Sequence, residues 1–562
     1  MQSTLASTGL FEKHRNTIES AIQAVHARSF FAHFPESPSK AIYGETAATD
    51  GLAAYESRLG HPFMLRQDYD HYAHADEVSP YTRRQLGITY PSFKQPGSFI
   101  ARARKALAPW KALGPEGRAG ILMESLERFR NRFFEMAHAT MHTTGQTFVM
   151  SFQASGPHAA DRALEAIALG YYEQLRFPTG TVEWVKPMGK FDVTMDKSYR
   201  LQPQGLSLCI GCSTFPVWNS LPGLYASLVT GNPVLVKPHP TAIYPLALIV
   251  QDIQEVLAEN GMDVHVAQLV TDRLTEPVTR TLAESPEVKI IDFTGGNDFG
   301  NFLETLPGKI LFTEKAGVNC ALIDSVDQIK PVVQNLAFSL SMYSGQMCTA
   351  PQNVFIPKDG ISTADGHLSY DEVKQALADA VKGIATHPQM GANVLGAIQS
   401  DATLRRMDAV RGSVVNVLLE PVAVVHPDFP EARLSAPLLL EATAQDRELI
   451  GKEWFGPIAL VVQVENTAQA VRIAADLAQT KGAISCSAYV TDVETKHLIV
   501  DQMADAGVQV SLNFTGNFWV NQNAGFSDFH VTGGNPAGSG SLTDPAFIVR
   551  RFFRVGLREF KA

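Results

Sequence analysis

Cysteine is scarce in this sequence: the 562 residues include five, at positions 209, 212, 320, 348 and 486. So few thiols, so far apart, exclude a disulfide-stabilised secreted scaffold. Cys209 and Cys212 have the CxxC spacing of redox and zinc motifs, but no second CxxC or histidine pair completes a set of four ligands. The two cysteines also close the apolar run Leu206–Ile210, which favours a structural role at a buried strand.

Long apolar segments are also lacking. No stretch approaches the roughly 18 consecutive apolar residues of a membrane helix, and the longest candidate, Leu221–Val236, is interrupted by two prolines, a glycine and an asparagine. The first residues, MQSTLASTGLFEKHRN, contain no apolar secretory core. We therefore expect a cytoplasmic protein that does not span a membrane.

Positive charge is in deficit, with 47 lysines and arginines against 57 aspartates and glutamates and a formal net charge of −10. This balance argues against nucleic acid as the main partner, because neutralising phosphates requires a basic face. Hydrophobic residues make up 45% and charged residues 19%, an ordinary globular composition. A globular chain of this length is expected to form two or three domains.

Short apolar runs alternate with amphipathic stretches from residue 206 to residue 490. The predicted strands are Leu206–Ile210, Val234–Val236, Val264–Val270, Lys289–Phe293, Ala321–Asp324, Val354–Ile356, Ile458–Val462 and Cys486–Val490. The predicted helices between them are Pro222–Thr230, Ala242–Glu259, Lys330–Met342 and Thr467–Gln479. Alternation of this kind indicates βαβ units and parallel sheets. We predict an α/β fold with two such domains.

The flanking regions have other patterns. Residues 1–91 are polar and aromatic-rich and are predicted to form short, turn-bounded pieces, and apolar residues at three- and four-residue intervals predict helices between 98 and 145. Residues 179–204 alternate like a β-hairpin, and the basic, aromatic tail from residue 546 is also β-rich. An exposed β edge is normally covered. We therefore expect a partner subunit there, in a homodimer or tetramer.

Histidine and carboxylate side chains gather in the N-terminal region. The candidates are His61, His71, His74, Asp68, Asp70, Asp76 and Glu77. Nothing places them on one face of a regular element, so a solvated surface is favoured over a metal cluster. His138 and His142 are four residues apart, but no glutamate is placed as in HExxH. We predict no metal site.

Six separated segments carry the strongest functional signal. They are Phe215-Pro216, Val236–Pro238, Phe293–Gly300, Thr313–Gly317, Gly345–Cys348 and Glu453–Pro457. In this order and spacing they resemble the NAD(P)-dependent aldehyde dehydrogenase superfamily, over roughly residues 92–562. The segments MHTTGQTF, GPHAADRALEA, EKAGVN and YSGQMCTAPQN are similar to the PaaN-type phenylacetate-degradation branch, which is related to the dehydrogenase half of the bifunctional PaaZ enzymes.

The resemblance implies a cofactor domain, a catalytic domain and a small β oligomerisation element. We expect the cofactor domain at residues 92–180 and 204–314 and the catalytic domain at 315–528. The oligomerisation element is expected at 181–203 and 529–562, and residues 1–91 are expected to form an extension packed on the cofactor domain.

Aldehyde oxidation by this chemistry needs a nucleophile and a base. A cysteine thiolate attacks a carbonyl readily and can leave again from a thioester, and the resemblance gives this role to Cys348. The thioester is hydrolysed by water that a base activates, and the resemblance assigns Glu314. Relatives usually have an asparagine as oxyanion donor where this chain has Thr214. The Thr214 hydroxyl, the backbone N–H of Cys348 and Asn219 are alternative donors.

The cofactor residues also follow from the resemblance. Lys237 is expected at the adenosine ribose, and Gly295, Gly296 and Gly300 open a helix beneath the pyrophosphate, where glycine permits close approach and a helix N-terminus favours an anion. Two further residues, Glu453 and Phe455, are expected at the nicotinamide ribose and ring. NAD-preferring relatives usually carry a glutamate at the position of Pro240. Its absence removes repulsion of a 2′-phosphate and favours NADP, with NAD as the alternative.

We therefore predict an NAD(P)-dependent aldehyde dehydrogenase that oxidises an aldehyde to a carboxylic acid through a cysteine thioester. The branch resemblance implies a CoA-linked semialdehyde from aerobic phenylacetate ring cleavage. One alternative is a CoA-acylating enzyme, which the retained Glu314 disfavours. Another is a semialdehyde dehydrogenase of a different aromatic pathway, of the benzoyl-CoA type. A non-catalytic binding protein on the same fold is disfavoured by the presence of Cys348, Glu314 and Glu453.

Overall fold

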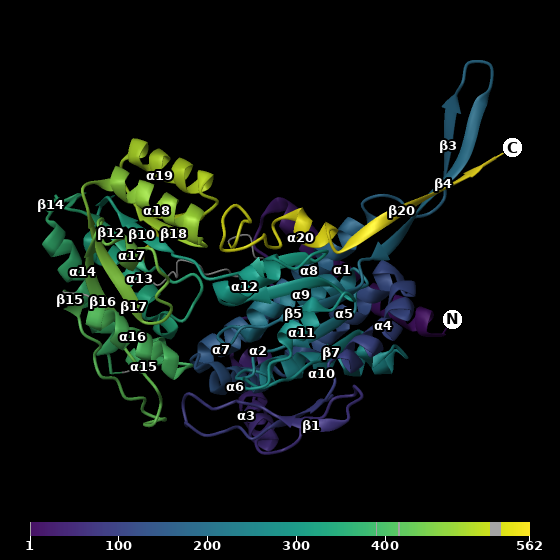
Figure 1. Cartoon of the computed structure of the whole chain (residues 1–562), viewed down its shortest axis with the longest axis horizontal. Helices are drawn as coiled ribbons and strands as arrows, with labels where there is room; N and C mark the ends of the chain where they lie inside the picture. Colours follow the sequence, from purple (N-terminus) through teal and green to yellow (C-terminus); the bar gives the residue numbers. More distant parts are fainter. Residues whose placement is uncertain (1, 389, 414–415, 517–529, 562) are drawn as a thin grey trace.

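The structure, a computed structural model, describes residues 2–388, 390–413, 416–516 and 530–561. The chain forms two bodies, each built on a largely parallel sheet, and a narrow three-stranded sheet that projects away from them (Figure 1). The predicted two parallel-sheet α/β bodies are therefore present. No helix within the described ranges has the length and hydropathy of a membrane span.

The first body contains a five-stranded parallel sheet with strand order β7-β6-β5-β8-β9. Its strands are β5 Leu206–Ile210, β6 Val234–Lys237, β7 Ala267–Leu269, β8 Val288–Thr294 and β9 Ile310–Glu314, and its connecting helices are α9 Pro216–Val229, α10 Tyr244–Glu259, α11 Thr279–Glu284 and α12 Asn297–Glu304. Every residue of β5 and β6 is buried, as expected for parallel strands covered on both faces. The parallel order brings the carboxyl ends of the strands to one edge, where ligands bind in open α/β sheets.

Five helices between residues 97 and 175 pack on the sheet and on its connecting helices. They are α4 Gly97–Ala112, α5 Gly114–Arg130, α6 Phe133–Thr144, α7 Phe148–Ser155 and α8 Pro157–Leu175. The helical periodicity predicted between residues 98 and 145 is therefore observed, as three successive helices.

The second body contains a seven-stranded sheet with order β15-β16-β17-β12-β10-β18-β19, in which only β15 is antiparallel to its neighbour. The strands are β10 Cys320–Ile323, β12 Asn353–Pro357, β15 Val417–Leu419, β16 Leu438–Thr443, β17 Ile458–Val464, β18 Ser485–Tyr489 and β19 Gln509–Leu512. The helices are α13 Ile329–Ser341, α14 Tyr370–Ala385, α15 Gly391–Leu395, α16 Asp401–Ser413, α17 Arg447–Ile450, α18 Thr467–Lys481 and α19 Val493–Asp505. Alternate residues of β10 pack on opposite layers: Ala321 joins the α13/α14 side and Leu322 the α18/α19 side.

The projecting sheet consists of β3 Val182–Pro187, β4 Asp192–Pro203 and β20 Phe552–Phe560, all antiparallel. The predicted hairpin at 179–204 is thus present, and the tail strand pairs with β4 along its whole length. The prediction of a β-strand from residue 546 was wrong for its first part, because Pro545–Val549 forms a short helix, α20, which Asp544 caps through the N–H of Ala546. A small separate sheet contains β11 Ser325–Val326, β13 Ile361–Thr363 and β14 Gly366–Leu368.

The N-terminal region contains a long helix that the sequence pattern did not predict. Helix α1, Gln2–Ala27, packs on α5 and α8. Its buried stripe includes Phe11, His14, Ile18 and Ala21, which recur at three- and four-residue intervals. The stripe is weak in hydrophobicity because His14 belongs to it. The shorter elements that follow are α2 Lys40–Tyr43, α3 Ala47–Arg58, β1 His71–His74 and β2 Thr89–Ser92.

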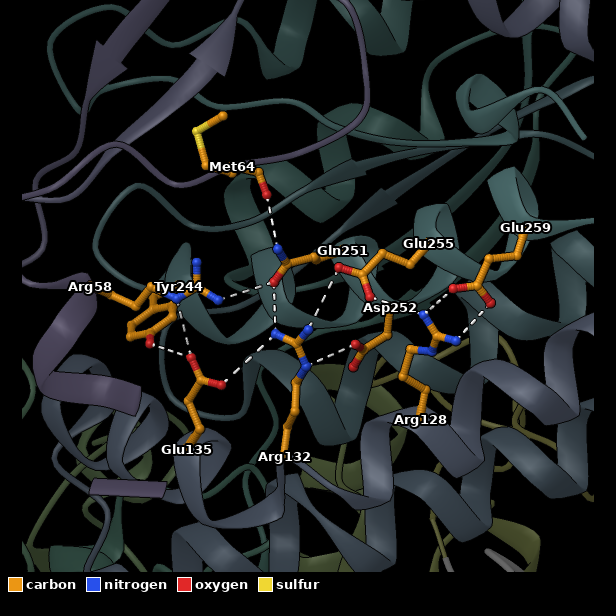
Figure 2. Close-up of polar contacts among 10 residues, drawn as sticks. All are labelled: Arg58, Met64, Arg128, Arg132, Glu135, Tyr244, Gln251, Asp252, Glu255 and Glu259. Carbon is orange, nitrogen blue, oxygen red and sulfur yellow. Dashed lines mark hydrogen bonds and ion pairs between the residues drawn. The ribbon is translucent and has the colours of Figure 1, made fainter. Parts of the chain in front are cut away.

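A polar network joins this N-terminal region to helices α5, α6 and α10 (Figure 2). Arg132 is at its centre: its Nε lies 2.9 Å from Asp252 Oδ1, and its Nη1 donates to Gln251 Oε1 at 2.7 Å. Gln251 in turn donates to the carbonyl of Met64 at 3.0 Å. The loop after α3 is therefore fixed to α10, the helix that follows strand β6.

Two predicted elements differ in extent from the observed ones. The strand predicted at Val264–Val270 is a single 3₁₀ turn, Val264–Val266, followed by the three-residue β7. Helix α9 begins at Pro216, six residues before its predicted start, and contains Pro222 in its interior. Because Pro222 has no N–H, it leaves the carbonyl of Trp218 without a helical partner. Arg162 Nη1 donates to that carbonyl at 2.8 Å instead.

Candidate active site

Cys348 lies in the turn between α13 and β12, at the face of the second body that meets the five-stranded sheet. The turn is tightly constrained. Tyr343 and Ser344 both have left-handed backbone conformations, with φ of 51° and 50°. The Tyr343 hydroxyl donates to the carbonyl of Thr144 at 2.5 Å, and Asn319 Nδ2 donates to the carbonyl of Cys348 itself at 2.7 Å. The sulfur is partly accessible and belongs to no disulfide.

Glu314 is the last residue of β9, so the parallel sheet presents it at the same edge as Lys237. Its side chain is 11% exposed and contacts three groups. Asn219 Nδ2 donates to Oε1 at 3.1 Å, His530 Nε2 lies 2.8 Å from Oε2, and the Cys348 thiol is hydrogen-bonded to the carboxylate. A carboxylate oxygen of Glu314, the Cys348 sulfur and a ring nitrogen of His530 all lie within 4.8 Å of one another.

The protonation states of this group follow from burial and contacts. Burial by itself raises the pKa of the Glu314 carboxyl, but the charge and contact of His530, the Cys348 thiol and Arg162 together hold it below its ordinary value. Burial and the neighbouring Glu314 charge raise the pKa of the Cys348 thiol well above its ordinary value. At neutral pH the proton therefore stays on sulfur while an ionised carboxylate contacts it. In this arrangement a carboxylate can accept the proton of a thiol.

Thr214 and Cys212 lie beside this group, in the loop after β5. The Thr214 hydroxyl is bonded to the Cys212 sulfur, and its carbonyl accepts from Gln146 Nε2 at 2.7 Å. Burial raises the pKa of the Cys212 thiol to about 11. Cys209 points the other way, into the sheet, and donates to the carbonyl of Ser220 at 3.5 Å. The two cysteines make separate contacts, and the oxyanion role of Thr214 remains a prediction.

Lys237 ends β6 and is almost fully buried. Its Nζ lies 2.6 Å from Asp272 Oδ1 and also donates to the carbonyl of Pro238 at 2.6 Å. Burial lowers the pKa of Lys237, against the effect of Asp272. Asp272, in the loop after β7, was not identified from the sequence. Pro240 is also buried, and its carbonyl accepts from the backbone N–H of Asp76 in the N-terminal region at 3.2 Å.

The predicted glycines divide into two kinds. Gly296 is the N-cap of α12, and a Cβ there would meet nothing within 4 Å, so its backbone faces open space. Gly295 and Gly300 are required by packing: a Cβ would lie 2.7 Å from the Phe293 ring in the first case and 2.5 Å from Lys315 in the second. A free helix start beside an open surface suits an anion.

Glu453 and Phe455 follow α17 in the second body. Burial raises the pKa of Glu453 to about 7, while the Gly317 backbone N–H and Arg406 lower it. Arg406 also donates to the carbonyl of Phe455. A cavity of about 660 Å³ is lined by residues of both bodies, among them Asn297, Lys315, Gly317, Lys452 and Glu453. The start of α12 and Glu453 thus face one shared space.

Three residues near Glu314 and Cys348 were missed at the sequence level or left without a role. His530, Trp218 and Arg162 come from a C-terminal loop, α9 and α8. Arg162 is stacked on the Trp218 ring, 3.4 Å from its centre, and His530 meets the same ring edge-on at 5.0 Å. No spacing rule links positions 162, 218 and 530, so the sequence contains no signal that would have found them.

The N-terminal histidines and carboxylates do not converge. Three of them form separate pairs: His71 with Asp70, Asp68 with Arg102, and Asp76 with Arg273. Glu77 is buried and accepts from the Tyr90 hydroxyl at 2.7 Å. His138 and His142 pack against Tyr55, and burial lowers the pKa of each to about 4.

A cysteine thiol contacting a largely buried glutamate, at the junction of two α/β bodies with a glycine-started helix nearby, is the arrangement expected of an aldehyde-oxidising site. The chain belongs to the aldehyde dehydrogenase family, which it matches over residues 69–539. It is similar to an NAD-dependent aldehyde dehydrogenase from Burkholderia multivorans, with 44% identity and a TM-score of 0.96 over 98% of this chain and 99% of that one. The predicted fold and enzyme class are confirmed: this is an NAD(P)-dependent aldehyde dehydrogenase.

More distant structures share the fold alone. A 1-pyrroline-5-carboxylate dehydrogenase from Thermus with bound NAD is 17% identical, with a TM-score of 0.71 over 94% of this chain and 99% of that one. An NADP-dependent glyceraldehyde-3-phosphate dehydrogenase from Bacillus halodurans C-125, complexed with NADP, is 18% identical, with a TM-score of 0.68 over 90% of this chain and 98% of that one. Relatives of both cofactor types thus have this architecture.

Proposed function

We propose that this aldehyde dehydrogenase acts hydrolytically, with Cys348 as the nucleophile and Glu314 as the base. The observation that carries the proposal is the contact between an ionised, buried carboxylate and a protonated thiol. Glu314 takes the proton from sulfur as the C–S bond to the aldehyde carbon forms. The adduct oxygen has the backbone N–H of Cys348, Asn219 and Thr214 as candidate donors.

When bound, NAD(P) would supply the hydride acceptor for oxidation of this adduct to a thioester. Hydrolysis then needs a water beside Glu314. A cavity of about 50 Å³ adjoins the carboxylate and is lined by Arg162, Asn219, Thr294 and His530, among others, which is room for water with polar partners. Glu314 releases the proton that it took from sulfur and then accepts the water proton as the new C–O bond forms. The C–S bond breaks, the acid is released, and the Cys348 thiolate that leaves takes its proton back from Glu314.

The residues around the strand ends suit a dinucleotide. The open N-terminus of α12 at Gly296 and the cavity shared with Glu453 both offer groups for it. Lys237 and Asp272 would hold the adenosine ribose, Gly295 and Gly296 the pyrophosphate, and Glu453 and Phe455 the nicotinamide half.

For the choice between the two cofactors we propose NADP. Pro240 leaves no carboxylate at the usual glutamate position. The charge of Asp272 is paired with Lys237 at 2.6 Å. Arg273 follows Asp272 and has a half-exposed guanidinium, a group that accommodates a 2′-phosphate in other dinucleotide sites.

For the substrate we propose a CoA-linked semialdehyde from aerobic phenylacetate ring cleavage. The reason is the similarity of four segments to the PaaN-type enzymes: 141–148, 156–166, 314–319 and 343–353. A semialdehyde of a benzoyl-CoA type pathway is the nearest alternative. Glu314, held against Cys348, favours water over free CoA as the acceptor of the acyl group.

We further propose the expected domain roles. Residues 92–180 and 204–314 form the cofactor domain, 315–528 the catalytic domain, and 1–91 an extension on the former; positions 517–528 of the catalytic domain lie outside the described residues. The projecting sheet, from 181–203 and 529–562, would join subunits in a homodimer or tetramer. Exposed apolar side chains on β20, such as Phe553, Val555 and Leu557, support that role.

The proposal is tested by following NAD(P)H absorbance with purified enzyme, either cofactor, and a panel of free and CoA-linked semialdehydes, with and without free CoA. We expect reduction without added CoA, fastest with CoA-linked aldehydes and NADP. Reduction that requires free CoA would assign the enzyme to the acylating class instead.

A further inference from the structure

We propose that His530 is a positioning residue that keeps Glu314 ionised and aimed at Cys348. This inference rests on the proposed function, because it assigns a role through the base of that reaction. The inference goes beyond the proposed function because it names a histidine from the C-terminal loop as the group that sets the pH range in which Glu314 is ionised.

The imidazole is built into the core of the site. His530 is 1% exposed, its Nε2 lies 2.8 Å from Glu314 Oε2, and its backbone carbonyl accepts from Gln509 Nε2 at 3.2 Å. Both ring nitrogens are buried without a well-formed hydrogen bond among the described residues, and Nε2 is the one that lies at ion-pair distance from the carboxylate. The Nε2 side of the ring is therefore the side that serves the carboxylate.

Aromatic stacking fixes the plane of the ring. The imidazole meets Trp218 edge-on, with ring centres 5.0 Å apart and planes at 78°. Trp218 is held by Arg162, whose guanidinium covers the indole at 3.4 Å and donates to the Trp218 carbonyl that Pro222 leaves free. The chain from α8 through α9 to His530 thus sets the direction from which Nε2 approaches Glu314.

Charge then determines what the contact does. The pair in contact is His530 and Glu314. The other titratable side chains around it are Cys348 and Cys212, with Arg162 on the far side of the Trp218 indole. Burial raises the pKa of the Glu314 carboxyl, and His530 makes the largest contribution that lowers it. Removing His530 takes away the largest effect that lowers this pKa, so the pKa of Glu314 should rise and the base should become protonated at a higher pH.

The proton balance does not involve His530 as an acceptor. In the attack step the S–H bond breaks and an O–H bond forms on Glu314, while His530 Nε2 stays in contact with the carboxylate. Glu314 then releases this proton to solvent, so that in hydrolysis the proton from water can take the same place. His530 acts on both steps through Glu314 and does not touch the aldehyde.

The test compares His530→Ala and His530→Gln with the wild type in steady-state rate against pH and in the hydride burst. We expect the acid limb of kcat/KM to move to higher pH by about one unit or more in His530→Ala, the scale of a neighbouring charge. His530→Gln retains an amide donor without the charge and should show a smaller shift in the same direction. At high pH the burst amplitude should match the wild type.

His142→Gln is the matched control, because His142 is also buried but bonds to Ser79 and lies outside the site. Its acid limb should not move. An unchanged limb in both His530 variants, or an equal loss of rate at every pH, would overturn the inference and leave His530 a purely structural role. Failure of the proposed function would look different, as undiminished turnover in Cys348→Ala or Glu314→Gln.

Discussion

Arg551 and Asp292 form a buried ion pair joined by two bonds, with Nη1 2.7 Å from Oδ2 and Nη2 2.5 Å from Oδ1. Asp292 belongs to β8, and Arg551 immediately precedes the tail strand β20. The same guanidinium also donates to Ser227 Oγ at 2.6 Å and to the carbonyl of Phe547 at 2.8 Å. The pair anchors the C-terminal tail to the sheet that presents Glu314.

Arg551→Met should therefore be strongly destabilising. Losing one partner leaves Asp292 buried without its counter-charge, which costs about 3–5 kcal/mol of unfolding free energy. Arg550→Met is the matched control, because the neighbouring Arg550 is exposed, and should cost under about 0.5 kcal/mol. Urea unfolding followed by tryptophan fluorescence measures both, and similar midpoints for the two variants would contradict the anchoring role.

Cys348→Ala should abolish NAD(P)H formation while leaving cofactor binding intact, because the sulfur is the proposed nucleophile and the cofactor residues lie elsewhere. Turnover and the fluorescence of bound NAD(P)H are measured on the same preparation. Cys212→Ala removes a neighbouring thiol and should retain turnover. Dehydrogenase activity that survives in Cys348→Ala would refute the assignment.

Cofactor choice should respond to residues at the ends of β6 and β7. Pro240→Glu places a carboxylate that accepts from a ribose 2′-OH and repels a 2′-phosphate. Arg273→Ala removes the exposed cation beside Asp272. Each should lower the NADP-to-NAD ratio of kcat/KM by about tenfold, a difference of about 1.4 kcal/mol. If neither variant changes the ratio, other residues select the cofactor.

The projecting sheet should control assembly. Val555 and Leu557 are alternate, exposed apolar residues of β20, and lysine at both positions protects such an edge from pairing. The double variant should have a lower mass by light scattering than the wild type. Val493→Lys, which changes an exposed valine on α19, is the control and should keep the wild-type mass. A wild-type monomer would rule out this role.

The sequence pattern predicted those elements whose residues are apolar on every side. Strands such as Leu206–Ile210 and Val234–Lys237 are buried on both faces, so their composition identifies them directly. Helix α1 was not predicted because a histidine lies in its buried stripe, and α9 was predicted too short because Pro222 reads as a helix start. Both errors arise where tertiary contacts outweigh local propensity.

For the site, residues within short motifs were predicted and their distant partners were not. Lys237 and Glu314 each end a strand, and Cys348 follows a helix, in a recognisable segment. His530 and Asp272 act on Glu314 and Lys237 through space, from loops whose sequences have no motif. Thr214 stands at the expected position, but its hydroxyl faces Cys212. One-dimensional spacing contains no information on such contacts.

The most direct test of the central claim is the fate of the acyl group in Glu314→Gln. Glutamine keeps the contact with Asn219 but cannot accept a proton, so hydrolysis should slow by about 10²–10⁴-fold. The hydride burst should still appear, but more slowly than in the wild type, because the thiol has lost its base as well. Mass spectrometry of the quenched enzyme should then find the acyl group of the aldehyde on the peptide that contains Cys348. A free Cys348, or an acyl group elsewhere, together with an unchanged steady-state rate, would contradict a thioester at Cys348 that Glu314 hydrolyses.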